Sequence, residues 1–168
     1  MNPIIDSIYA TGECVSPDGT GHSVFPTAIK RAEGEALYRL TRDLDARQTL
    51  EVGMAWGLSS LFFCQAHQDA GHALPAHTAV DPFQVQGFHS MALHNLAAAG
   101  LREGVTFVGE SSHTALPRLV SEGKRYDLIF IDGCHLFDGA LVDFFFSDQL
   151  LPVGGHLVFD DLWMPAVR

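Results

Sequence analysis

Basic side chains are scarce in this chain of 168 residues, which carries 10 Lys and Arg against 20 Asp and Glu. The formal net charge is −10 at pH 7. Because nucleic acids and anionic membranes are bound through basic patches, this balance argues against both as partners. An acidic excess is also a common solubility feature, so the charge alone identifies no ligand.

Cysteine and long apolar runs are equally sparse. The three cysteines are odd in number and show no Cys-x-x-Cys spacing, which argues against a disulfide framework and a structural zinc site. No apolar run approaches the ~20 residues of a membrane span, and the first residues lack the basic flank and apolar core of a signal peptide. We therefore expect a reducing, cytoplasmic environment.

Histidine is common, with nine residues, but its spacing is uninformative. The pairs His72/His77 and His89/His94 are each five residues apart, so neither pair shares a helical face as residues four apart do. We expect most of the histidines to lie on the surface or in loops.

The remaining composition, 47% hydrophobic and 18% charged, is typical of one globular domain. Residues 1–24 are broken by proline and glycine and predict an irregular N-terminal arm before a core over 25–168. A helical stripe over 26–45 follows, and then five short apolar runs alternate with helix-like segments. The expected strands are 49–52, 78–80, 105–108, 128–131 and 156–159, and the expected helices are 58–70, 87–99, 112–122 and 137–151.

This alternation predicts an α/β fold with a Rossmann-like, doubly wound, mostly parallel sheet. Right-handed crossovers would place strand 49–52 at the centre, with strands 78–80 and 128–131 on opposite sides. In such sheets ligands bind at the carboxyl ends of the strands, and nearly every expected strand here ends in a carboxylate. We expect these acids to face one crevice.

The stretch "LEVGMAWGLSS", residues 50–60, runs from a strand through a Gly-x-x-x-Gly turn into a helix. Glycines allow the backbone to bend tightly and let a ligand approach the helix N-terminus. An ordinary structural turn is the alternative. The nicotinamide fingerprint, the phosphate-binding loop with its lysine and the nucleophile elbow are absent from the sequence.

The acid Glu51 before this turn, the turn itself and Asp81 after the next strand together resemble class I S-adenosylmethionine-dependent methyltransferases. The resemblance implies that S-adenosylmethionine binds across the turn, with the ribose hydroxyls on Asp81, since a carboxylate accepts hydrogen bonds from both. The other cofactor contacts that it implies are Glu51, Gly53, Gly57 and Ser59 for the methionine part, and Glu110 and Ser111 for adenine.

The segment "FIDGCHLFDGALVDFFFSDQLLPVGGHLVFDDLWMP", residues 130–165, is similar to small O-methyltransferases of the macrocin and cephalosporin-biosynthesis type, and more distantly to catechol O-methyltransferase. The resemblance implies a Mg²⁺ ion on Asp132, Asp160 and Asp161, with Asp132 and His135 as catalytic residues and His135 as the general base. Three carboxylates in one crevice repel one another unless a cation is present, and oxygen ligands suit Mg²⁺. A helix cap for the acidic pair and a structural role for His135 are the alternatives.

The expected function is therefore methyl transfer from S-adenosylmethionine to a hydroxyl of a small molecule, such as a vicinal diol, a sugar or a phenol, with Mg²⁺ chelating the acceptor oxygens. The alternative is a catalytically inactive cofactor-binding fragment or protein-interaction module of the same fold. The family's sheet normally continues with a helix and an antiparallel strand pair, which this sequence does not supply. We thus expect a C-terminally truncated core whose exposed edge at 156–159 supports homo-oligomers.

Overall fold

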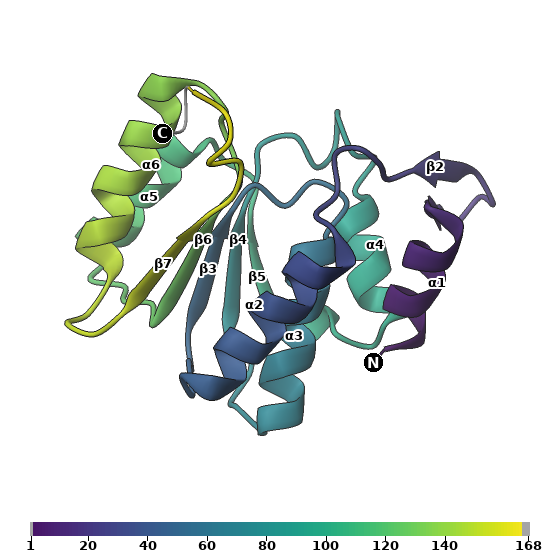
Figure 1. Cartoon of the computed structure of the whole chain (residues 1–168), viewed down its shortest axis with the longest axis horizontal. Coiled ribbons are helices and arrows are strands. Elements are labelled where there is room, and N and C mark those ends of the chain that lie inside the picture. The colour runs from purple at the N-terminus through teal and green to yellow at the C-terminus, as the bar shows by residue number, and fades with distance from the viewer. Residues whose placement is uncertain (1, 166–168) are drawn as a thin grey trace.

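The computed structural model describes residues 2–165, and its centre is a five-stranded parallel sheet with helices on both faces (Figure 1). The strand order is β5-β4-β3-β6-β7. The strands are β3 (Thr49–Val52), β4 (His77–Val80), β5 (Val105–Val108), β6 (Leu128–Ile131) and β7 (His156–Phe159). All four strand pairs of this sheet are parallel. The central place of β3, between β4 and β6, confirms the predicted topology.

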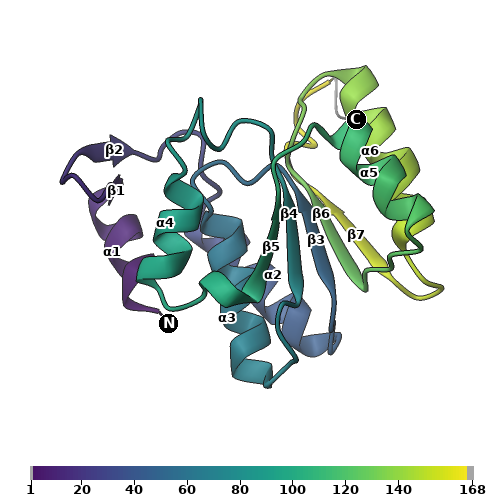
Figure 2. The ribbon, with the colours of Figure 1, turned by 180° about the vertical axis from the view of Figure 1, so that it is seen from behind.

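The helices cover the two faces of the sheet separately. Figures 1 and 2 show α5 and α6 on one face and α2, α3 and α4 on the other. The bounds are α2 Arg31–Asp43, α3 Leu58–Ala70, α4 Met91–Ala98, a 3₁₀ turn η1 at Arg102–Gly104, α5 Ser112–Ser121 and α6 Phe137–Leu150. Most agree with the predicted segments within a residue or two. In residues 2–165 no helix combines the length and apolar character that a membrane span requires.

Helix α4 begins four residues later than predicted, because the preceding segment closes into turns. The amide groups of Gly87 and Phe88 both donate to the carbonyl of Phe83, at 2.7 and 3.1 Å. Those bonds fix a loop beyond the end of β4. Helix α4 is therefore shorter than the predicted helix 87–99 and covers only Met91–Ala98.

Each face of the sheet has its own apolar core. Leu50 and Val52 of β3 pack in one cluster with residues of α5 and α6, such as Leu116 and Leu150. The other cluster, which includes Phe62, lies between the sheet and α2 and α3. Because side chains alternate along a strand, Thr49 and Glu51 point to this second face, where both are fully buried.

The predicted irregular N-terminal arm is wrong, since residues 3–23 form a helix, α1 (Pro3–Thr11), and a hairpin of β1 (Glu13–Val15) and β2 (Gly21–Ser23). Asn2 caps the helix by accepting from the Ile4 amide at 3.1 Å. Gly12, at φ 74°, ends it in the left-handed conformation. The proline and glycine therefore mark the start and stop of a helix.

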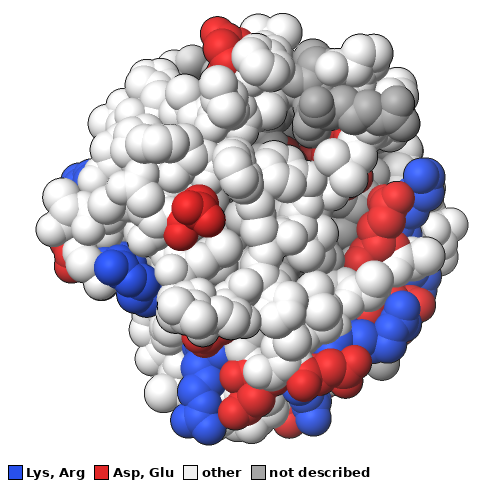
Figure 3. Space-filling model, turned by 60° about the vertical axis from the view of Figure 1, so that its left-hand side comes forward, with Lys and Arg blue, Asp and Glu red and all other residues white. Residues whose placement is uncertain are grey.

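The surface over α6 and β7 carries few charges. Figure 3 brings this side forward and shows a broad, mostly white area in which charged side chains are few and isolated. Helix α6 exposes Leu141, Phe144 and Phe145 by 52%, 45% and 58%. The homo-oligomer predicted through the neighbouring β7 edge stays a prediction.

Helices α2 and α3 pack closely at Gly34, where a Cβ atom would lie 2.1 Å from Cε2 of Phe62. A glycine inside a helix ordinarily costs about 0.5–1 kcal/mol relative to alanine. At this position the missing side chain is instead what lets the two helices approach.

Gly34→Ala is therefore expected to lower the free energy of unfolding by about 1–3 kcal/mol, measured by urea denaturation, despite the better helix propensity of alanine. The control is the same change in a Phe62→Val background, which removes the ring atoms that the new methyl group meets. There Gly34→Ala should be neutral or stabilising. Equal destabilisation in both backgrounds would contradict the close-approach explanation.

Candidate functional site

The predicted site residues at the strand ends lie in one row along the carboxyl edge of the sheet. The register pairs Val52 with Val80 on one side and with Ile131 on the other, and pairs Ile131 with Phe159. The residues that directly follow are Asp81, Gly53, Asp132 and Asp160, from β4 across to β7. Asp81, Asp132 and Asp160 thus share one edge, whereas Glu51 lies within β3 and is fully buried.

The turn after β3 leaves no room for side chains at its glycines. Gly53 has φ +90°, and a Cβ there would lie 2.0 Å from the carbonyl oxygen of Asp132. Gly57 has φ +81°, and a Cβ there would lie 2.7 Å from Cβ of Ala92. Helix α3 begins immediately after Gly57, so its amide-rich N-terminus opens onto the turn.

A small cavity lies against this turn and brings Gly53, Ser59 and Asp132 together on its wall. The segment before α2, at Thr27–Ile29, closes its other side. A larger hollow of about 300 Å³ lies at the opposite, amino edge of the sheet, beside Asp45, Arg47 and His156. We place the candidate site at the small cavity, because Asp132, the glycine turn and the N-terminus of α3 meet there.

Asp81 fastens the turn to the end of β4. Its Oδ2 accepts hydrogen bonds from the amides of Met54 and Ala55, at 3.0 and 2.8 Å, and its Oδ1 accepts from the Phe83 amide at 2.7 Å. The Gln84 amide group adds a fourth donor at 3.1 Å. Its ribose contact stays a prediction, and a sugar would have to share this carboxylate with the turn.

The other predicted cofactor residues take different places. Glu51 is fully buried on the α2 and α3 side of the sheet, where the Ser60 hydroxyl donates to it, and it does not line the small cavity. Glu110 forms an ion pair with Arg118 at 2.8 Å. Ser111 occupies the N-cap position of α5, without a capping hydrogen bond from its side chain. Their contacts with a cofactor stay predictions.

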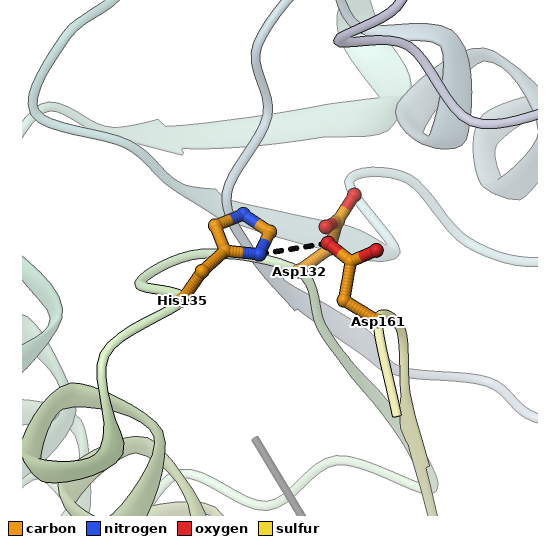
Figure 4. A group of neighbouring side chains, drawn as sticks. All are labelled: Asp132, His135 and Asp161. Atoms are coloured by element: carbon orange, nitrogen blue, oxygen red, sulfur yellow. Dashed lines mark ion pairs between the residues drawn. The ribbon is translucent and has the colours of Figure 1, made fainter. Parts of the chain in front are cut away.

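Asp132, His135 and Asp161 point toward one another at the end of β6 (Figure 4). One ligand atom from each lies within 4.8 Å of the other two, and Nδ1 of His135 is 2.7 Å from Oδ2 of Asp161. Asp161 has φ 54°, a left-handed conformation unusual for a residue with a side chain. The structure thus brings together two of the three predicted metal ligands and the predicted base.

Asp160 is the predicted ligand outside this group of three. Its Oδ1 accepts a hydrogen bond from the Asp161 amide at 2.7 Å. His135 is the third member of the group in its place. The contact between His135 and Asp161 was not predicted from the sequence. Ligand atoms 2.0–2.1 Å from one Mg²⁺ ion lie at most about 4.2 Å apart, which is close to the 4.8 Å within which these three atoms lie. A donor set of two carboxylates and an imidazole also suits Mn²⁺ and other transition metals.

Burial and crowding disfavour negative charge in this group. Burial, with the neighbouring charges of Asp160 and Asp161, raises the pKa of Asp132 to about 8. Burial also raises the pKa of Asp160 above its ordinary value. A bound cation would reverse this balance, because it stabilises the ionised carboxylates.

Asp132→Asn is expected to flatten the pH dependence of stability in the presence of a chelator. The folded chain holds the Asp132 proton up to about pH 8, whereas the unfolded chain releases it near its ordinary pKa. The folded state then binds more protons between these values, so the free energy of unfolding falls as the pH rises. Thermal unfolding from pH 5 to 8 measures the slope. Asp148→Asn, at an exposed carboxylate of α6, is the control, and equal slopes in the parent and Asp132→Asn would contradict the assignment.

The sequence is similar to one known protein family and to two plant enzymes. The profile of a family described as "Methyltransferase domain" matches residues 50–162. Caffeoyl-CoA O-methyltransferase 2 of Petunia hybrida and caffeoyl-CoA O-methyltransferase 3 of Nicotiana tabacum are each 27% identical over 143 residues, which is 80% of this chain and 54% of each relative. The chain therefore spans about half the length of these curated relatives.

The fold is shared with solved structures at low sequence identity. Cofactor-bound Rv0187 from MTB superimposes with a TM-score of 0.74 at 21% identity, over 95% of this chain and 65% of the other. The O-methyltransferase TomG from Streptomyces achromogenes, in complex with SAM, gives 0.70 at 22% identity with the same coverage. An O-methyltransferase from Bacillus cereus with SAH gives 0.66 at 17% identity, over 88% and 60%. These likenesses confirm the predicted Rossmann-like fold.

Proposed function

The chain belongs to the methyltransferase domain family, and from that premise we propose that it binds S-adenosylmethionine and transfers its methyl group to a hydroxyl of a small molecule. One observation supports this most strongly. The glycine turn and the group of Asp132, His135 and Asp161 adjoin at a single edge, with Gly53 packed on the Asp132 backbone. A methyl donor on the turn and an acceptor at the acidic group would then lie side by side.

The proposed cofactor site is the turn from Gly53 to Gly57. The missing side chains allow a ligand to approach the backbone, and the N-terminus of α3 favours the carboxylate of a methionine moiety. Asp81 is the proposed ribose acceptor. The proposed location of the protein is the cytoplasm.

The proposed acceptor site is the group of Asp132, His135 and Asp161, completed by Asp160 as a further carboxylate. Mg²⁺ held there would lower the pKa of an acceptor hydroxyl and orient it. The contact of His135 Nδ1 with Asp161 leaves Nε2 as the nitrogen that takes the hydroxyl proton. Asp161 holds the ring in place for that step, and the remaining rate enhancement comes from alignment of donor and acceptor.

The names of the plant relatives suggest a phenolic acceptor with adjacent oxygens. Two neighbouring hydroxyls can both reach one ion, which fits the proposed acidic group. The competing function is a cofactor-binding fragment without turnover, or a protein-interaction module of the same fold. The sparsely charged surface over α6 and β7, with Leu141, Phe144 and Phe145 exposed, favours the protein-interaction module as a second candidate, because such a surface suits association.

The metal proposal is tested by Mn²⁺ binding, followed by electron paramagnetic resonance, and by S-adenosylhomocysteine formation with 3,4-dihydroxybenzoate as the probe acceptor. Asp132→Asn and Asp161→Asn are expected to weaken Mn²⁺ binding at least tenfold and to abolish turnover, while Asp148→Asn changes neither. Turnover in excess chelator equal to that with Mg²⁺ would contradict the metal role. Cofactor binding without turnover of any diol probe would favour the competing function.

The ribose proposal is tested by changing the ligand, because substitution of Asp81 would also disturb the turn. The 2′-deoxyribose analogue of S-adenosylhomocysteine is expected to bind the parent chain more weakly by about 1.5–3 kcal/mol, the value of a hydrogen bond to a charged group. Isothermal titration measures both ligands, and an N6-methyl analogue, modified far from the ribose, is the control. Equal affinity for the parent ligand and the deoxy analogue would rule out a ribose bond to Asp81.

A further inference from the structure

A continuous chain of polar side chains crosses the buried layer between the sheet and helices α2 and α3. We call it the buried relay, and its members in order are Asp45, His72, His67, Thr49, His77 and Glu51. The four outer contacts have hydrogen-bond distances, whereas Nε2 of His77 makes no hydrogen bond and lies 3.3 Å from Oε1 of Glu51. None of these contacts involves the acidic group at the end of β6.

Only one end of the buried relay reaches water. His67, Thr49 and Glu51 are fully buried and His77 is 1% exposed. The side chain of Asp45, at the other end, is 65% exposed and lies at the amino edge of the sheet. Glu51 stands two residues before Gly53, beneath the proposed cofactor turn. The buried relay thus joins the underside of that turn to solvent at the opposite edge.

The contacts at the exposed end fix which atoms donate. Asp45 can only accept, because the hydrogen bond from His72 holds the pKa of its carboxyl below the ordinary value. Nε2 of His72, 3.0 Å away, must therefore carry a hydrogen. When His72 is neutral its Nδ1 has only a lone pair, so it accepts from Nδ1–H of His67 at 2.9 Å.

The same reasoning continues inward. Burial lowers the pKa of His67 to about 3, so this ring carries a single hydrogen at neutral pH. With that hydrogen on Nδ1, Nε2 of His67 accepts from the Thr49 hydroxyl at 2.8 Å. The Thr49 oxygen then accepts from Nδ1–H of His77, also at 2.8 Å.

The inner end of the chain requires one more proton. With its hydrogen on Nδ1, neutral His77 would turn the lone pair of Nε2 toward the Glu51 carboxylate at 3.3 Å, and two acceptors would face each other in a buried site. One proton between Nε2 and Oε1 of Glu51 removes this conflict. The Ser60 hydroxyl already donates to the same carboxylate oxygen.

We propose that the buried relay is a proton path, along which one proton moves between the Glu51–His77 pair and His72 at the amino edge of the sheet. In the transfer, Glu51 gives its proton to Nε2 of His77, Nδ1 of His77 gives one to Thr49, Thr49 gives one to Nε2 of His67, and Nδ1 of His67 gives one to Nδ1 of His72. Each inner group gains one proton and loses one. Glu51 becomes a carboxylate, His72 becomes an imidazolium beside Asp45, and the number of protons is unchanged.

Other titratable groups lie near the inner end. The Cys64 thiol of α3 is kept protonated, because burial raises its pKa well above the ordinary value. The charge of Arg102 in η1 lowers the pKa of Cys64 in part, and a negative charge on Glu51 raises the pKa of Asp132 at the end of β6. The path therefore changes the charge under the turn by one unit. This inference concerns the chain itself and stands apart from the methyl-transfer proposal.

The test is the tautomer of each histidine, read from long-range ¹H–¹⁵N correlation spectra of the full ¹⁵N-labelled chain at neutral pH. His67 and His77 are expected to carry hydrogen on Nδ1, and His72 on Nε2. In molecules whose His72 carries hydrogen on both ring nitrogens, His67 and His77 should both carry hydrogen on Nε2. His67 with hydrogen on Nε2 beside a neutral His72 would overturn the proposal.

Thr49 supplies matched variants, since it is the only hydroxyl between the two rings in the buried relay. Thr49→Val keeps the shape but removes the hydroxyl, so His77 should move its hydrogen to Nε2, facing Glu51, while His67 keeps Nδ1–H. Thr49→Ser retains the hydroxyl and should leave both tautomers as in the parent. If Thr49 had only a structural role, both variants could change the free energy of unfolding, but the His77 tautomer would not change in Thr49→Val alone. An unchanged His77 tautomer in folded Thr49→Val would overturn the proposal.

Discussion

The close contact between Gly53 and the backbone of Asp132 is the constraint on which the candidate site depends. A side chain at Gly53 would collide with the Asp132 carbonyl oxygen, so β3 and β6 can end side by side only with glycine there. That contact brings the turn, the N-terminus of α3 and the acidic group to one edge. The parallel register extends the row to Asp81 and Asp160. In the proposed function, donor and acceptor subsites are neighbours for this reason.

The two faces of β3 serve different purposes. Leu50 and Val52 supply apolar surface to the core under α5 and α6. Thr49 and Glu51, on the other face, are polar and buried, and they are tolerated because histidines from α3 and β4 pair with them. The strand that carries the glycine turn is thus attached to a polar layer below it as well as to an apolar one. In the proposed proton path, the charge of Glu51 beneath the turn depends on His72 and Asp45 at the opposite edge of the sheet.

The strands and most helices could be predicted from the sequence, because buried parallel strands are short apolar runs and their ends carry the acids. The N-terminal helix was missed because Pro3 and Gly12 were interpreted as breakers, although Asn2 before them is a capping residue. The buried histidines were also missed, since most histidines were expected on the surface. Thr49 meets His77 only because β3 and β4 pair in one register, and spacing along the chain does not reveal register. The contact of His135 with Asp161 depends on the left-handed backbone of Asp161, which no local sequence signal indicated.

In the proposed function, cofactor and metal meet at the Gly53–Asp132 contact. The most direct measurement is a crystal structure of the chain with S-adenosylhomocysteine and Mn²⁺, in which anomalous scattering locates the ion. We expect the ligand across the turn from Gly53 to Gly57 and the ion on Asp132 and Asp161, with Asp160 as the further carboxylate. A ligand in the larger hollow beside Arg47 and His156, or an ion away from Asp132, would contradict the account.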